Sequence, residues 1–382
     1  MSLSGHHALV LTMFFGSFSW SFVYISLPFH IQAISTWDAG ATLRWTGWIL
    51  GITPLVTVVT APLWGRLGGS GDPKTLYALV QAVQGVGFFG MAIARTLPEL
   101  FLSRLVLGVM GAASTFAFMS AGRSADIREV RRQVAAVQSA MTVGQVIGPL
   151  AGAIAAARLG FQESFVLGGL VLVACGALVH WGVPAAGARE ERRAAAGPTP
   201  WREVIAVALL LLAGSTQIFF LTAILPQVLP PLGVDPARML EVGGFVIFAS
   251  GAAAALGSLL APWLSEAWPE HRLIAVLLVA SSLSVAALAL VDSVWLYGAL
   301  RFLQVLFIAP IFPIVVSRVT QSAGGAAIGL INSARIGAAF IGPVIATTTL
   351  AWTPPAVLYV ILAAIGLACL PLTAVRAPSR AR

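Results

Sequence analysis

A short apolar motif occurs twice in this chain, and its repetition limits the folds that the chain can adopt. Residues 137–153 read VQSAMTVGQVIGPLAGA, and residues 331–345 read INSARIGAAFIGPVI. At an offset of 194 residues, the Gly148-Pro149 pair aligns with Gly342-Pro343. Both segments are apolar and long enough to cross a bilayer. Two further landmarks recur in the same order: Ala61-Pro62 as Ala261-Pro262, and Arg104 as Arg301. This pattern predicts two related halves with small insertions in the loops.

Twelve apolar runs of about 20 residues follow one another, six on each side of a polar stretch. They cover residues 8–29, 45–65, 75–94, 99–121, 134–157, 164–183, 204–226, 241–264, 273–291, 295–317, 326–350 and 356–375. The sequence therefore predicts an all-α membrane protein with twelve transmembrane helices in two pseudo-symmetric six-helix halves. We expect the halves to be residues 1–183 and 204–382, joined by a cytoplasmic linker over residues 184–203, which is rich in charge, Ala and Pro.

Composition agrees with this fold class. Only 9% of the residues are charged and 58% are hydrophobic, whereas a typical soluble domain has about 25% charged residues. The net charge of +8 arises from basic residues in short loops, so it does not predict a nucleic-acid partner. Cys175 and Cys369 lie inside apolar runs, where we expect them to pack and not to bind metal. No nucleophile–base set, metal-ligand cluster or phosphate loop is present, so we expect no enzymatic activity and no cofactor.

The basic residues also predict the orientation. With both termini in the cytoplasm, fifteen of the 22 Lys and Arg residues lie on the inner side and four lie on the outer side. The inner residues are Arg66, Lys74, Arg123, Arg128, Arg131, Arg132, Arg189, Arg192, Arg193, Arg202, Arg272, Arg318, Arg376, Arg380 and Arg382, and the outer residues are Arg44, Arg95, Arg158 and Arg238. This bias predicts a multi-pass protein of the inner, cytoplasmic membrane.

Small residues mark the expected gating and packing elements. The fifth run contains Gly144, Gly148-Pro149 and Gly152. Small residues four apart let two helix backbones approach closely, and proline removes a backbone donor. Plain helix packing explains a single such motif equally well, but its recurrence at Gly342-Pro343 favours a specific role. The loop expected after the second run, which begins at Gly65 and contains Asp72, is either a gating element or a tight polar turn.

These motifs resemble those of the major facilitator superfamily. The fifth-run motif resembles the antiporter motif that is thought to seal the pathway between the halves of exporters in that family. The Gly65–Lys74 loop resembles the signature loop of the family, with Gly69 and Ser70 in place of its aspartate and arginine. The segment from Asn332 to Arg335 and the Trp45-Thr46-Gly47 sequence look like the twelve-helix drug:proton antiporter branch. The resemblance implies transport by alternating access between two halves.

Three arginines lie within the runs, where a charge costs about 2.5–3.5 kcal/mol unless it faces a cavity or a polar partner. Arg104 resembles an arginine that the family associates with proton or substrate handling. Alternatively, Arg104 lies near the membrane edge and extends its charge to the surface, and Arg301 shares that ambiguity. Arg335 lies deeper, with Asn332 on the same helical face. We therefore expect Arg335 and Asn332 to bind substrate.

The carboxylates leave the coupling mechanism open. All fourteen acids fall in loops or at the ends of runs, whereas proton coupling usually requires a buried carboxyl. Glu99 and Glu241 are the nearest candidates, ahead of His30 and His180, which we expect at the membrane interface.

Polar and aromatic side chains within the runs supply further candidates for substrate binding. Aromatic rings provide apolar contact and amides provide orientation. The candidates with polar atoms that lipid would not satisfy are Trp20, Tyr24, Gln145, Gln217 and Gln304. Packing against neighbouring helices is an equally good explanation of these residues.

These observations predict a monomeric secondary exporter of small amphiphilic compounds in a lipid bilayer, coupled to protons. The alternative is an uncoupled or substrate-driven carrier of an anionic metabolite, because three arginines lie within the runs without an opposing acid. A membrane receptor without transport activity is a third interpretation, which a long soluble appendage would favour.

Overall fold

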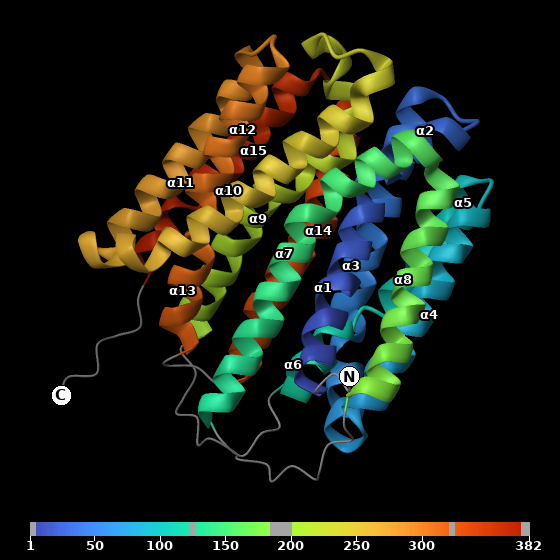
Figure 1. Cartoon of the computed structure of the whole chain (residues 1–382). Coiled ribbons are helices and arrows are strands. Elements are labelled where there is room, and N and C mark those ends of the chain that lie inside the picture. The colour runs from blue at the N-terminus through green and yellow to red at the C-terminus, as the bar shows by residue number, and fades with distance from the viewer. Residues whose placement is uncertain (1–4, 122–126, 184–200, 321–324, 376–382) are drawn as a thin grey trace, which may run out of the picture. The chain divides into compact units, whose positions relative to one another are not determined.

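The computed structural model describes residues 5–121, 127–183, 201–320 and 325–375, and almost all of these residues are helical. The first part of the chain contains α1 (Gly5–Tyr24), α2 (Leu27–Ile34), α3 (Ala39–Ser70), α4 (Pro73–Ile93), α5 (Leu97–Val109), α6 (Ala113–Ala121), α7 (Ile127–Leu159) and α8 (Phe161–Gly182). The second contains α9 (Trp201–Val228), α10 (Met239–Ala267), α11 (Glu270–Ala287), α12 (Val294–Ile308), α13 (Ile311–Thr320), α14 (Gly325–Leu350) and α15 (Pro355–Ala368), with four short 3₁₀ turns. Figure 1 shows these elements.

Within the described residues, twelve helical segments are long and apolar enough to cross a membrane, which confirms the predicted number. Three of these spans are interrupted, although the sequence predicted continuous helices. The first span divides into α1 and α2, the fourth into α5 and α6, and the tenth into α12 and α13. Pro28 and Pro310 lie beside two of the interruptions. Proline has no N–H to continue a helical ladder, so it favours a break at these points.

The helices group into two compact units. Unit 1 consists of Met1–Trp37, Trp48–Glu191 and Leu240–Phe248, and unit 2 consists of Asp38–Gly47, Arg192–Met239 and Ala249–Arg382. Two helices contribute to both units, because residues 39–47 of α3 belong to unit 2 and residues 240–248 of α10 belong to unit 1. The predicted boundary at residues 184–203 remains a prediction: residues 184–200 lie outside the described part of the chain, and α9 begins at Trp201.

Each unit has a core of apolar side chains between its helices. In unit 1, α7 packs against α1, and α8 packs against α4. Tyr77, Phe116 and Val137 are fully buried in this core. In unit 2, α14 packs against α9, while α11 packs against α12 and α15. Its core includes Val204, Ile274 and Val315. Both units therefore place the fifth helical span of their half against the first one.

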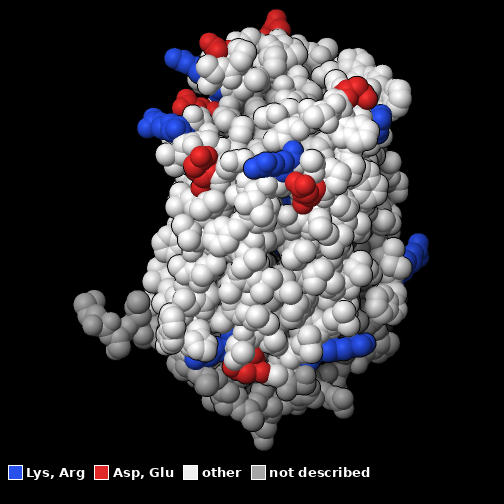
Figure 2. All heavy atoms as spheres, turned by 90° about the vertical axis from the view of Figure 1, so that its right-hand side faces the viewer, with Lys and Arg blue, Asp and Glu red and all other residues white. Residues whose placement is uncertain are grey.

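The surface is apolar over a wide area, as expected for a protein surrounded by lipid. The middle of the face in Figure 2 consists almost entirely of uncharged side chains, and Lys, Arg, Asp and Glu gather toward its two ends. Large side chains such as Val59, Leu259 and Trp295 are well exposed. The side of the membrane that each end faces stays a prediction, since Arg123, Arg189, Arg192, Arg193, Arg376, Arg380 and Arg382 lie outside the described residues.

Candidate functional site

The repeated motif forms a close helix contact in unit 1. A Cβ atom added to Gly148 would lie 2.9 Å from the carbonyl oxygen of Phe18 and 3.0 Å from the backbone nitrogen of Phe22. One turn earlier, a Cβ on Gly144 would lie 2.5 Å from the carbonyl oxygen of Phe14, and Gly152 directly faces the backbone of Phe22. Only glycine permits α1 and α7 to approach so closely. The predicted packing role of Gly144, Gly148 and Gly152 thus has a direct geometric basis.

The equivalent contact in unit 2, between α9 and α14, is wider. A Cβ on Gly342 would lie 3.3 Å from the carbonyl oxygen of Thr216 and 3.2 Å from the nitrogen of Phe220. These partners correspond to Phe18 and Phe22 at a constant offset of 198 residues. The two other glycines of the motif are replaced by Ala338 and Ala346, which already carry side chains. The substitutions require α9 and α14 to lie further apart along this contact.

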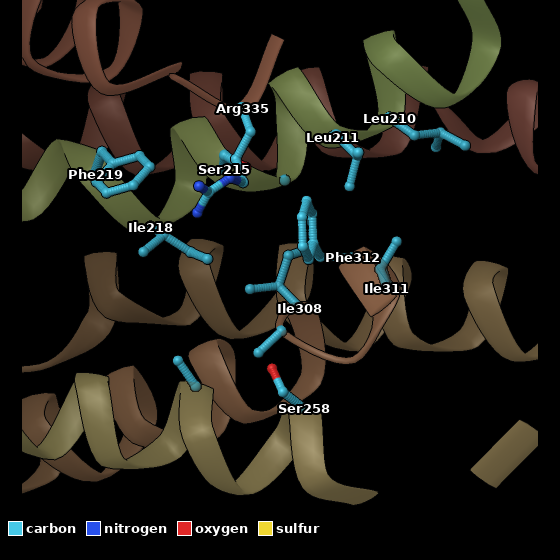
Figure 3. Close-up of a pocket in the computed structure, with 13 residues that line it drawn as sticks. Leu210, Leu211, Ser215, Ile218, Phe219, Ser258, Ile308, Ile311, Phe312 and Arg335 are labelled. Carbon is cyan, nitrogen blue, oxygen red and sulfur yellow. The ribbon is translucent and has the colours of Figure 1, made fainter. Parts of the chain in front are cut away.

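One polar pair makes the difference between the units visible. In unit 1, the Ser17 hydroxyl donates a 3.0 Å hydrogen bond to the backbone carbonyl of Met141. The equivalent positions in unit 2, by the offsets of 198 and 194, are Ser215 and Arg335. These two residues line a cavity instead of closing a helix contact, and Figure 3 shows the Arg335 head group beside Ser215. We take this cavity, named here the Arg335 cavity, as the candidate functional site.

The Arg335 cavity has a volume of about 150 Å³ and lies within unit 2. Its walls come from α9, α10, α12, α13 and α14 together with Ala309, and most are apolar. The lining residues are Leu210, Leu211, Gly214, Ser215, Ile218, Phe219, Ala254, Ser258, Ile308, Ala309, Ile311, Phe312 and Arg335. One of them is charged, two are hydroxyl residues and none is acidic. An apolar cavity with few polar groups is typical of a small-molecule site.

Arg335 is the polar centre of this cavity. Its guanidinium lies over the Phe312 ring, with 5.2 Å from Cζ to the ring centroid. Its Nε is buried and has no hydrogen-bond partner in the described part of the structure. Asn332, which the sequence placed on the same helical face, is exposed and does not line the cavity. The structure therefore separates these two predicted substrate ligands.

Arg104 has a different environment, in the interior of unit 1. Its side chain is 2% exposed, and it donates hydrogen bonds of 3.2 and 3.4 Å to the carbonyl oxygens of Ile49 and Leu50. The guanidinium also lies 5.5 Å from the Trp20 ring centroid and 5.8 Å from that of Tyr24. Burial against neighbouring helices excludes the alternative that Arg104 extends to the membrane surface. Trp20 and Tyr24, two predicted substrate ligands, serve here as partners of this cation.

Arg301 occupies a corresponding place in unit 2 and is 1% exposed. It donates hydrogen bonds of 2.6 Å to the carbonyl oxygens of Gln217 and Ile218, and a further one to Oε1 of Gln304. Its guanidinium also lies 5.0 Å from the Phe220 ring centroid. Two of the three intramembrane arginines thus use their donors on backbone and amide oxygens inside the protein.

The predicted amide ligands fall into two groups. Gln217 and Gln304 are fully buried, and both exchange hydrogen bonds with Ser281. Gln217 also donates to Ser282 and to the carbonyl oxygen of Leu362. The Ser281 hydroxyl donates to Gln217 and accepts from Gln304, so it links the two amides in the core of unit 2, and neither amide lines the cavity. Gln145 is exposed on α7 in unit 1.

The expected loop after the second run is largely helical. α3 continues through Gly65 to Ser70, and only Gly71 and Asp72 separate it from α4. A Cβ added to Gly65 would meet no atom of the described residues within 4 Å, so none of these residues requires a glycine here for close packing. Asp72 caps α4 by accepting hydrogen bonds of 3.2 Å from the backbone N–H groups of Lys74 and Thr75. Glycine content alone therefore led to a wrong loop boundary.

The predicted proton carriers lie at helix ends. Glu99 is exposed and accepts hydrogen bonds from the backbone N–H groups of Arg95 and Thr96, which makes it part of the capping box of α5. Glu241 is exposed in the first turn of α10. His30 is 2% exposed and packs edge-on against Phe165 from its place in α2, and its expected place at the membrane interface stays a prediction. The Arg335 cavity brings none of these groups together.

Of the residues that line the cavity, Arg335 is the one that the sequence predicted as a site residue, and the missed residues include Ser215, Ser258 and Phe312. Isolated serines and phenylalanines in an apolar run carry no distinct signal. A comparison of the first and seventh runs would have found Ser215, because Gly16-Ser17 recurs as Gly214-Ser215.

Comparison with known proteins gives a consistent result. The sequence model of the Major Facilitator Superfamily matches residues 9–291. The uncharacterised MFS-type transporter YuxJ of Bacillus subtilis is 23% identical over 88% of each chain. The multidrug resistance efflux pump PmrA homologue of Lactococcus lactis is 25% identical over 76% of this chain and 73% of its own. The structure of the nucleoside transporter NupG superposes with a TM-score of 0.76 at 13% identity, covering 98% of this chain and all of NupG, and this likeness concerns the fold.

Proposed function

The chain belongs to the major facilitator superfamily, and we propose that it exports small amphiphilic compounds across the cytoplasmic membrane. Members of this family are membrane transporters and not enzymes, so the chain is a multi-pass transporter. Export is supported by the similarity to the PmrA homologue and to the multidrug resistance protein MdtG of Salmonella dublin, which is 22% identical over 75% of this chain and 72% of its own.

The Arg335 cavity is the observation that carries the proposal. It combines apolar walls with one cationic group and two hydroxyls in unit 2. Apolar walls bind the apolar part of an amphiphile by excluding water, and a few polar groups fix its orientation. We propose alternating access as the mechanism: the two halves expose the cavity to each side of the membrane in turn.

We further propose that the proton gradient supplies the energy. Within the described residues, every Asp and Glu lies in a loop or within a few residues of a helix end. A carrier at such a position meets water more readily than one in the middle of a span. Glu241 is the better candidate of the two predicted acids, because Glu99 is already engaged as a helix cap.

The experiment is an efflux assay on cells that express the full chain. Cells are loaded with a lipophilic dye, and efflux is followed with and without a protonophore. The proposal expects faster efflux than from cells without the protein, and loss of the difference when the protonophore is added. Equal efflux from both cell types, with the protein present in the membrane, would contradict export of amphiphiles.

A second candidate is an uncoupled or substrate-driven carrier of an anionic metabolite. It is favoured by the presence of Arg335 and the lack of any acidic residue among those that line the cavity. Such a carrier would accelerate exchange of labelled for unlabelled anion, and a protonophore would leave that exchange unchanged.

A further inference from the structure

The three intramembrane arginines differ in how their donors are used. Arg104 and Arg301 donate to backbone carbonyl oxygens of neighbouring helices. The Nε atoms of Arg301 and Arg335 both lack a hydrogen-bond partner among the described residues, but Arg301 engages its two terminal nitrogens. The described residues offer the Arg335 guanidinium the Phe312 ring and no hydrogen-bond acceptor. An unsatisfied buried donor is costly, and a ligand that accepts hydrogen bonds from it removes that cost. Arg335 is thus the cation that has capacity for a ligand.

The chemistry of the cavity specifies the sign of that ligand's charge. No Asp or Glu is among the described residues that line the cavity, so none of them neutralises the guanidinium charge. A guanidinium presents a planar fork of N–H donors that matches two oxygens of a carboxylate or a sulfonate. Ser215, which lies beside the Arg335 head group, and Ser258, on the opposite side of the cavity, offer hydroxyls for any remaining acceptor (Figure 3).

The size of the cavity limits the apolar part of the ligand. A dry cavity of about 150 Å³ with aliphatic and aromatic walls is known to hold a benzene molecule, and the Arg335 cavity has the same volume. The Phe312 ring and the Ile308 and Leu211 side chains supply comparable walls. Drug-sized ligands need roughly 300–1,000 Å³. One ring next to an anionic group therefore fits the cavity, while the rest of a larger molecule would extend out of it.

We propose that the Arg335 cavity binds amphiphilic monoanions that carry a ring-sized apolar group, such as aromatic carboxylates or sulfonates. Their oxygens accept hydrogen bonds from Arg335, and the ring packs between Phe312 and the aliphatic walls. The inference rests on the proposed function, because it names the substrate class of the same site. It goes further in that it excludes cations of equal size.

The test uses three ligands of similar size whose charges do not change near neutral pH: benzenesulfonate, benzenesulfonamide and phenyltrimethylammonium. Their binding to the purified full chain in detergent is measured by calorimetry. We expect benzenesulfonate to bind at least about tenfold more tightly than the uncharged sulfonamide, which loses the charge-assisted hydrogen bonds. The ammonium compound is expected to show no binding.

Two variants and a control assign the effect to Arg335. Arg335→Met, which introduces the residue found at the equivalent position 141, should abolish the preference for benzenesulfonate, whereas Arg335→Lys should retain it. Arg238→Gln changes an exposed arginine of the same unit and should bind like the unmodified protein. If Arg335→Met cannot be purified, the order of the affinities of the unmodified protein for the three ligands still tests whether the cavity prefers anions.

Equal affinity for the three ligands, tighter binding of the cation, or an undiminished preference in Arg335→Met would overturn the inference. The proposed function fails separately. If benzenesulfonate binds as expected but cells show no efflux, the anion site is supported and the proposed export function is contradicted. If dyes are exported but benzenesulfonate binds no more tightly than the other two ligands, the export function is supported and the anion site is contradicted.

Discussion

The Ser17 hydroxyl oxygen lies 3.0 Å from the carbonyl oxygen of Met141, within hydrogen-bond distance across the close α1–α7 interface of unit 1. At the equivalent positions in unit 2, Ser215 and Arg335 line a cavity. The change from methionine to arginine coincides with the replacement of Gly144 and Gly152 by Ala338 and Ala346. Two copies of one helix pair have thus diverged, one toward close packing and the other toward a polar opening.

The same substitution at two buried arginines should have different effects on stability. Arg301→Met removes the donor to the carbonyl oxygens of Gln217 and Ile218. We expect it to destabilise the protein by about 1–3 kcal/mol for each acceptor left unpaired. Arg335→Met removes a guanidinium whose buried Nε has no hydrogen-bond partner among the described residues, and it should leave stability unchanged or raise it by about 1 kcal/mol. Thermal unfolding in detergent measures both, and equal losses would contradict the distinction drawn here.

The glycines of the two helix pairs should differ in their tolerance of a methyl group. Gly148→Ala places a Cβ 2.7 Å from the Ser21 side chain, and overpacking of this kind costs about 1–3 kcal/mol. At Gly342 the nearest atom is 3.2 Å away. There, the gain of about 0.5–1 kcal/mol in helix propensity should offset the crowding. Comparable unfolding temperatures of the two variants would show that α1–α7 and α9–α14 are equally tight.

A bulkier change at the first of these positions should stop transport. Gly148→Leu forces α1 and α7 apart, because the leucine side chain extends well beyond the Cβ position that already meets the α1 backbone. We expect loss of dye efflux, because the variant either misfolds or folds into a carrier that cannot change conformation. Gly65→Leu is the matched control, since no atom in the described part of the chain lies within 4 Å of a Cβ there. Full efflux by Gly148→Leu would mean that close packing at this motif is dispensable.

The cap at the start of α4 gives a smaller effect. Asp72→Ala removes the side chain that accepts hydrogen bonds from the backbone N–H groups of Lys74 and Thr75. Loss of such a cap typically costs about 1 kcal/mol. Asp72→Asn keeps an oxygen acceptor and should recover most of the loss. Thermal unfolding of the two variants is the measurement, and indistinguishable results for Ala and Asn would argue against a capping role.

The sequence was sufficient to predict the helical architecture, because apolar runs of about 20 residues indicate helices that cross a lipid bilayer. Motif repetition also pointed to the contact at Gly148. The roles of Gln217 and Gln304 could not be predicted, since their hydrogen-bond partners include residues up to 145 positions away. Arg104 and Arg301 looked like site residues for the same reason: nothing local indicates which carbonyl oxygens satisfy a guanidinium.

Arg335 was predicted to bind substrate because its depth in an apolar run demands a polar environment; it lines a cavity, and substrate binding stays a prediction. Asn332 was grouped with it on helical periodicity alone, but periodicity places two residues on one face without determining what that face meets. The boundary at Gly65 was wrong for a related reason. Glycine weakens a helix by roughly 1 kcal/mol, and tertiary packing outweighs that cost as far as Ser70.

Efflux of labelled benzenesulfonate from proteoliposomes tests the central claim most directly, namely that transport uses the Arg335 cavity. The anion leaves down its own gradient, so the assay needs no assumption about coupling. Vesicles with the unmodified protein should empty faster than protein-free vesicles, and vesicles with an equal amount of folded Arg335→Met should empty no faster than those without protein. Equal rates for the unmodified protein and Arg335→Met would contradict the claim.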